Sequence, residues 1–167
     1  PIALSLSDAR LISEVSISSG KHVFCVMQNR FAPPSVWLKE LVDVGDLGKI
    51  HQVHIQCFWN RDDSYYAASK WRGTLALDGG PLFTQFSHFI DVMYWIFGGI
   101  KSPRAIFHNQ SHLHNTEFED SGSVSFDFKR QGFGTFTFST ALDRSNFESS
   151  LTLIAEKGTI RIGGQYM

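Results

Sequence analysis

Three polar side chains stand at near-helical spacing in the otherwise apolar stretch DGGPLFTQFSHFID, residues 78–91. Thr84 lies four residues before His88, and Asp91 lies three after it, so a helix over Pro81–Phe97 would project all three from one side. Because the pKa of histidine is near neutrality, His88 is a candidate general acid or base. The alternative is a core histidine satisfied by a backbone carbonyl or by Asp91.

A long polar and aromatic connection, NRDDSYYAASKWRGTLALDGG at residues 60–80, precedes this helix. Connections of this length inside a compact domain are often functional. Aromatic faces stack on sugar or nucleotide rings, and arginine forks onto carboxylates or phosphates. Tyr65, Tyr66, Trp71 and Arg72 are therefore candidates to hold a ligand. The alternative is a loop whose aromatic side chains patch the core.

Histidines and cysteines give weaker signals. His108, His112 and His114 would share one face of a strand, a set that could suit zinc, but no Cys or carboxylate accompanies them at a matching spacing, so we expect no metal site. Cys25 and Cys57 lie in apolar, strand-like runs. We expect both to be buried free thiols in a reducing compartment.

The elements that must position these residues fall into two groups. Apolar residues recur at helical spacing from Leu6 to Val15, and Gly20 ends the predicted helix. HVFCVM, residues 22–27, predicts a buried parallel strand. One helix and one strand cannot close a core, so residues 1–31 are interpreted as the C-terminal remnant of an α/β domain.

Residues 32–167 predict a second domain. An amphipathic helix over 35–45 and a half-buried strand after Gly48 come first, and a series of strands follows Gly98. Hairpin turns are expected at Gln131-Gly132 and Lys157-Gly158. SVSFDF and GTFTFS alternate strictly, so one sheet face is apolar. The other face carries hydroxyls suited to sheet-on-sheet self-association, on Ser123, Ser125, Thr135 and Thr137.

Composition narrows the class of protein. The 167 residues are 43% hydrophobic and include 15 phenylalanines, enough for a sizeable core. A net charge of -1 without a long basic run argues against nucleic-acid and anionic-membrane partners. No spanning apolar stretch and no secretory signal is visible, so we expect a cytoplasmic protein. The first residue is Pro1 rather than Met, which suggests a piece of a longer protein.

The stretch WRGTLALDGGPLFTQFSHFIDVMYWIFG, with QNRF, VGDLGKI and EKGTIRI, resembles the Gfo/Idh/MocA oxidoreductases, which are nicotinamide-dependent sugar and polyol dehydrogenases. The resemblance covers essentially the whole chain. It implies an α+β fold: a remnant of a Rossmann domain (1–31), then a domain with a large, open, mostly antiparallel sheet and helices on one face (32–167). QNRFAPPS, FWNRDDSYY and WRGTLALDGG are most similar to the enzymes that oxidise UDP-N-acetylglucosaminuronate at C3.

The resemblance also implies residue roles. His88 falls on the catalytic histidine, and Thr84 stands where an acidic residue is usual. A threonine hydroxyl is a poor proton acceptor at neutral pH, so we expect Thr84 to position a substrate hydroxyl. Cofactor-binding residues are expected at Gln28, Arg30, Trp71 and Arg72. Substrate-binding residues are expected at Asn60, Arg61, Tyr65, Tyr66, Gln85 and Asp91.

The implied activity is transfer of a hydride from a sugar or nucleotide-sugar carbon to NAD or NADP. The hydroxyl proton would go to His88 and to a lysine expected just before Pro1. Since the glycine-rich cofactor fingerprint is missing, we expect the 167 residues alone to bind no dinucleotide and to be inactive. Thr84 at the usual acidic position keeps open an alternative, a non-catalytic binding or assembly module.

Overall fold

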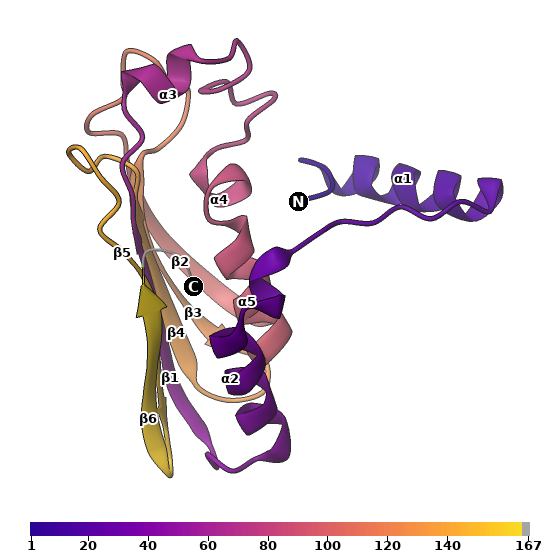
Figure 1. The fold of residues 1–167 in the computed structure, drawn as a ribbon, viewed down its shortest axis with the longest axis vertical. Helices are drawn as coiled ribbons and strands as arrows, with labels where there is room; N and C mark the ends of the chain where they lie inside the picture. The colour runs from indigo at the N-terminus through magenta and orange to yellow at the C-terminus, as the bar shows by residue number, and fades with distance from the viewer. Residues whose placement is uncertain (165–167) are drawn as a thin grey trace.

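The computed structural model describes residues 1–164, which form a sheet, a helical layer and an N-terminal arm (Figure 1). The helices are α1 (Leu6–Ser19), the 3-10 turn η1 (Gln28–Phe31), α2 (Pro33–Val44), α3 (Asp63–Ala67), α4 (Pro81–Thr84) and α5 (Ser87–Phe97). The strands are β1 (Ile50–Phe58), β2 (Ile100–His108), β3 (Ser121–Phe128), β4 (Phe133–Ser139), β5 (Glu148–Ala155) and β6 (Gly158–Gly164). None of the helices in this part of the chain is long and apolar enough to cross a membrane.

The six strands form one sheet in the order β2-β3-β4-β1-β5-β6. Only β1 and β4 run parallel; the other neighbouring pairs are antiparallel. The predicted α+β class with a mostly antiparallel sheet is therefore confirmed. The predicted hairpin turns join β3 to β4 and β5 to β6, and Gly132 in the first has a φ of 86°, a backbone conformation that glycine adopts without steric cost.

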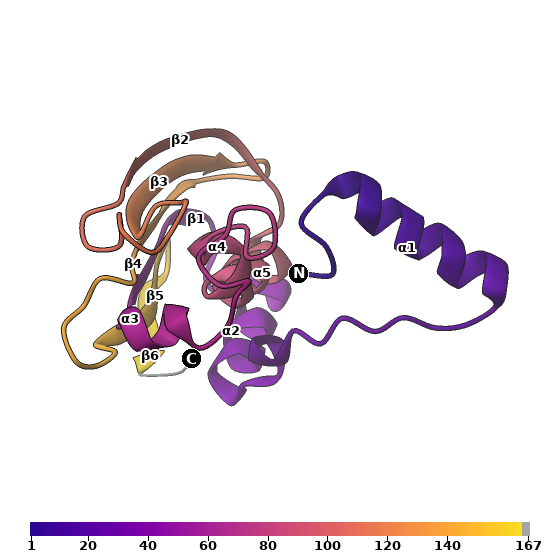
Figure 2. The same cartoon turned by 90° about the horizontal axis from the view of Figure 1, so that it is seen from above.

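Helices α2, α4 and α5 cover one face of the sheet (Figures 1 and 2). The alternation in the strands explains this, because Phe126, Phe128, Phe136 and Phe138 all point to that face and are buried. Helix α5 adds Phe89, Val92, Met93 and Ile96 to the same core. The opposite face carries the four predicted hydroxyl residues, which are exposed or half-buried.

Residues 1–27, here called the arm, stand away from the sheet (Figure 2). Ser5 caps α1 by accepting a hydrogen bond from the Asp8 amide at 3.1 Å, and Gly20 ends it in a left-handed conformation. No residue of α1 is buried.

The predicted strand at 22–27 is wrong, because the segment is extended but unpaired. A strand needs a hydrogen-bonded neighbour, and the pairings of residues 1–164 give this segment none. The same correction applies to Cys25, which was expected to be buried and is exposed; Cys57 in β1 is buried, as predicted.

The single helix expected over residues 81–97 is also wrong, because it divides into α4 and α5 at Gln85 and Phe86. Phe86 leaves helical geometry with φ -107° and ψ 3°. Its side chain is fully buried, with its ring 5.1 Å from that of Trp59 and 5.4 Å from that of Phe138. Burying this ring against the sheet compensates for the interrupted helix.

Candidate active site

His88 lies in the first turn of α5 and is half-buried. Its Nδ1 atom is shielded from solvent and has no hydrogen-bond partner within residues 1–164. Burial lowers the pKa of His88 below its ordinary value of 6.5, and Asp91 acts in the opposite direction. The imidazole is therefore mainly neutral near pH 7, the state that can accept a proton.

Asp91 does not hold the His88 ring, because its carboxylate is taken by Arg30. Arg30 donates from Nε to one carboxylate oxygen at 2.6 Å and from Nη2 to the other at 2.5 Å. This bidentate pair fastens η1 to α5, and the hydrogen bonds to Asp91 raise the pKa of Arg30. The Trp95 ring centroid lies 5.9 Å from the guanidinium carbon. The Arg30 guanidinium and the Asp91 carboxylate are therefore each neutralised by the other.

Thr84 ends α4, and its hydroxyl donates to the Gly80 carbonyl at 3.2 Å. The division between α4 and α5 separates it from His88, so the two do not share one continuous helix face. Gln85, in the division itself, faces the long connection and donates to the Tyr65 hydroxyl at 2.5 Å.

Four side chains form what we call the arginine–tyrosine cluster: Arg61, Tyr65, Arg72 and Gln85. Arg61 donates from Nε to Gln85 Oε1 at 2.7 Å. Its guanidinium carbon lies 5.1 Å from the Tyr65 ring centroid, and that of Arg72 lies 4.2 Å from the same centroid. The structure thus brings together four residues that the resemblance assigned to cofactor or substrate.

The other predicted residues are more scattered. Asn60 donates to the Leu142 carbonyl at 2.5 Å and sits beside the cluster. Tyr66 is buried, with its ring 5.1 Å from that of His112. Trp71 is 40% exposed, and Gln28 lies exposed on η1. The structure brings Asn60 to the cluster and leaves Gln28 apart from it.

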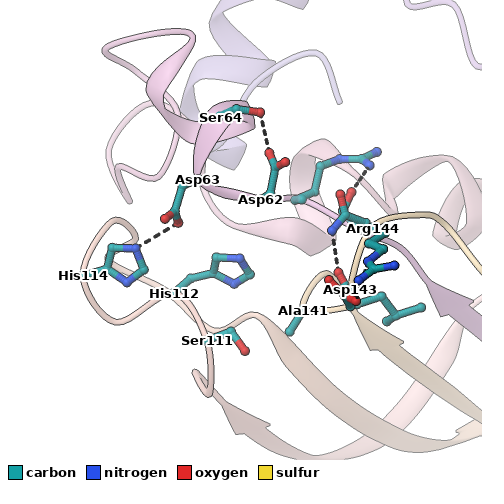
Figure 3. Close-up of a pocket in the computed structure, with 12 residues that line it drawn as sticks. Asp62, Asp63, Ser64, Ser111, His112, His114, Ala141, Asp143 and Arg144 are labelled. Atoms are coloured by element: carbon teal, nitrogen blue, oxygen red, sulfur yellow. Dashed lines mark hydrogen bonds and ion pairs between the residues drawn. The ribbon is translucent and has the colours of Figure 1, made fainter.

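A cavity of about 550 Å³ opens between α3 and the loops after β2 and β4 (Figure 3). Asp63 and His114 form a hydrogen bond of 2.9 Å at its edge, and His112 lies beside them (Figure 3). His112 pairs with the buried Asp120 at 3.1 Å. The strand expected to carry all three histidines ends at His108, so their side chains do not share one face.

Sequence reasoning missed several residues that shape the site. Asp78 is buried and accepts from the Gly73 amide at 2.9 Å, which closes the turn after Arg72. Asp120 accepts from two backbone amides and from His112. A carboxylate beside glycines or serines is the only local signal for such turn-closing roles. The Arg30–Asp91 pair joins positions 61 residues apart and has no local signal.

Three kinds of comparison with known proteins give consistent results. Residues 36–161 match the profile of the GFO/IDH/MocA C-terminal domain. The WlbA dehydrogenase of Bordetella pertussis, solved with NADH and UDP-GlcNAcA, is similar with a TM-score of 0.92 and 30% identity, over 99% of this chain and 50% of that one. The WlbA dehydrogenase of Chromobacterium violaceum, solved with the same two ligands, gives 0.90 and 33%, over 99% of this chain and 47% of that one.

Among curated proteins, Oxidoreductase P35 of Formosa agariphila is 25% identical over 163 residues, which are 96% of this chain and 49% of that protein. The chain thus spans about half the length of each of these relatives. The family resemblance is confirmed, and so is the mostly antiparallel sheet with helices on one face that it implied. With its profile match over residues 36–161 and its fold, the chain belongs to the Gfo/Idh/MocA oxidoreductase family, whose C-terminal domain it carries.

Proposed function

We propose that this chain is the substrate domain of a nicotinamide-dependent dehydrogenase that acts on a nucleotide sugar. The observation that carries the proposal is the likeness over 99% of the chain, at 30% identity, to a dehydrogenase solved with NADH and UDP-GlcNAcA. The site adds a neutral, half-buried histidine and two arginines that have no carboxylate partner among residues 1–164.

His88 would accept the proton of the sugar hydroxyl as the hydride leaves. Its lowered pKa keeps the ring neutral, the state in which a ring nitrogen can accept a proton. Thr84 has only a hydroxyl to offer, already turned to the Gly80 carbonyl, so its role would be to orient the substrate. Pro1 lines a cavity together with Ser87 and Asp91, the neighbours of His88 on α5. A lysine just before Pro1 would therefore lie near the start of α5.

Residues 1–164 do not fit a complete dinucleotide. A pyrophosphate site needs a glycine-rich turn between a strand and the N-terminus of a helix. Gly79-Gly80 leads into α4, but that helix has four residues, follows a loop and begins with a proline that lacks an N–H. We propose that a preceding domain holds the cofactor, which accepts the hydride when bound. Arg30 is held by Asp91, so it would act by holding η1 against α5 rather than by contacting the cofactor.

The division at residue 31 and the assembly belong to the same proposal. Residues 1–31 would complete a dinucleotide-binding domain, and residues 32–167 would bind substrate. The uncovered sheet face, with hydroxyls on Ser123, Ser125, Thr135 and Thr137, would pair with a second copy. Sedimentation should show a dimer or larger species. A strict monomer at high concentration would contradict the pairing.

The function is tested on the full-length protein that contains this chain. UDP-GlcNAcA with NAD or NADP should generate reduced nicotinamide, followed by its absorbance. The 167-residue chain alone should show no saturable NADH binding. If UDP-GlcNAcA binds without any reduction of the nicotinamide, the non-catalytic module becomes the better interpretation.

A further inference from the structure

Three arginines within residues 1–164 are half-buried, and two of them lack a carboxylate partner. Arg30 pairs with Asp91, whereas Arg61 and Arg72 form no ion pair with the described residues. Withdrawing a guanidinium from water without a counter-ion is unfavourable. Asp62 lies next in sequence to Arg61, but its carboxylate caps α3 by accepting from the Tyr65 amide at 3.0 Å.

The two unpaired cations share one aromatic ring. Both guanidinium carbons lie close to the Tyr65 ring, at the distances given above. Arg61 also lies 4.9 Å from the Trp59 centroid, and Arg72 lies 5.6 Å from that of Trp71. Contact with the aromatic rings holds each guanidinium in place, and no carboxylate of residues 1–164 neutralises either charge. A bound anion would supply the missing counter-charge.

The hydrogen bonds of the two arginines leave donors free on the same cluster. Arg61 uses Nε on Gln85 and Nη1 on the Asn60 carbonyl at 2.6 Å. Arg72 uses Nη1 on the Tyr65 carbonyl at 2.9 Å, and its Nε is shielded from solvent with no acceptor in the described part of the chain. Buried N–H groups without an acceptor are rare in folded proteins, and a missing ligand is one physical explanation. Nη2 of each arginine makes no hydrogen bond with residues 1–164, and guanidinium N–H groups match the oxygens of a carboxylate or phosphate.

We propose that Arg72, supported by Arg61, binds an oxygen anion of the substrate. This deepens the proposed function, on which it rests, and assigns Arg72 to the substrate rather than to the cofactor. A nucleotide-sugar acid offers two such anions, the carboxylate of the sugar and the diphosphate. Gln85 connects the cluster to the division between α4 and α5, so an anion held there orients the sugar relative to His88.

The test uses the full-length protein with four variants. Arg72→Gln removes both the charge and the guanidinium geometry. Arg72→Lys keeps only the charge, and Arg61→Gln removes the supporting charge. Arg130→Gln, in the exposed β3–β4 turn, is the matched control. Calorimetric titration measures the Kd of UDP-GlcNAcA, of UDP-GlcNAc, which lacks the carboxylate, and of UDP. Thermal unfolding of each variant checks that the fold is retained.

Arg72→Gln should weaken UDP-GlcNAcA binding by about 10- to 100-fold, as expected for a lost charged hydrogen bond. Arg72→Lys and Arg61→Gln should lose less, and Arg130→Gln should change nothing. If only UDP-GlcNAcA weakens, the carboxylate is the anion; if all three ligands weaken alike, it is the diphosphate. Unchanged affinities in a folded Arg72→Gln protein would overturn the proposal.

The outcome can be separated from the proposed function. If the wild type fails to bind UDP-GlcNAcA, the nucleotide-sugar assignment fails, and glucuronate and inorganic pyrophosphate are titrated instead. Binding of either that Arg72→Gln reduces would still support an anion site. If neither binds the wild type, or if Arg72→Gln has no effect, the anion site is refuted independently.

Discussion

The arm and the sheet domain contain similar apolar residues, but only the sheet domain buries them. In the arm, Ile17 is 79% exposed and Phe24 is 83% exposed, whereas Phe86 and Leu151 in the sheet domain are fully buried. The same side chains therefore contribute little to stability in one region and most of it in the other. Periodicity shows which face of an element is apolar, but a second element must be present before that face stabilises a fold.

The largest expected effect concerns His88, which lies where the start of the arm meets the sheet domain. In the full-length protein, His88→Ala should lower turnover by about 10²–10⁴-fold, the usual effect of losing a positioned acid or base. The melting temperature should change little, because the ring is only half-buried. Normal turnover with a lowered melting temperature would show that His88 is structural. Steady-state kinetics and thermal unfolding on one preparation decide between the two.

A matched pair of truncations tests burial directly. Phe86→Ala should lower the free energy of unfolding by about 3–5 kcal/mol, because it removes a fully buried ring from the core. Leu11→Ala, on an α1 side chain that is 58% exposed, should change it by less than about 0.5 kcal/mol. Urea unfolding of the 167-residue chain measures both. Equal losses would mean that the arm packs in solution.

A pair of glycine substitutions makes the same comparison for the backbone. Gly73 has a φ of 79°, and a Cβ there would lie 2.3 Å from the Asn115 carbonyl oxygen. Gly20 has a φ of 66° with open space around it. Gly73→Ala should lower global stability by about 2 kcal/mol or more, since strain and a backbone clash combine.

Gly20→Ala should instead fray the end of α1 and leave global unfolding nearly unchanged. Circular dichroism reports the helix, and urea unfolding reports the global transition. A global loss at Gly20 as large as that at Gly73 would contradict the division into two regions.

The smallest expected effect is a pH dependence from His88. Because its folded pKa lies below its ordinary value of 6.5, the unfolded chain binds a proton first as the pH falls. Stability should therefore be independent of this group above about pH 7 and decrease below about pH 6.5, by less than about 1 kcal/mol for a half-buried ring. His88→Gln should flatten that part of the curve. An unchanged slope in the variant would assign it to other groups.

Local elements of the fold could be predicted from the sequence. The Gly20 stop, the amphipathic α2, the alternating β3 and β4, and their hairpin turn all follow from side-chain types at fixed spacing. The division between α4 and α5 at Phe86 could not be predicted, because it depends on contacts with Trp59 and Phe138, which are distant in sequence. The strand expected at 22–27 failed for the same reason, because its sequence cannot show whether a neighbour is present.

The candidate site could likewise be predicted only in part. Motif resemblance drew attention to His88 and to the Trp71-Arg72 pair, and the structure places Arg72 with Arg61 on one aromatic ring. That Asp91 would face Arg30 rather than His88 was hidden, because the contact joins segments far apart in the chain. Charge pairing across such distances follows from the packing of η1 on α5.

The place of β1 in the sheet also affects the order in which the chain can fold. Ile55 lies beside Phe136 on one side and Leu151 on the other, so both neighbours of this central strand are made long after it. Closing such long loops is slow compared with forming the β3–β4 hairpin. During synthesis, β1 would leave the ribosome as an unpaired hydrophobic strand. This interval, more than the finished fold, is when we expect the chain to depend on chaperones.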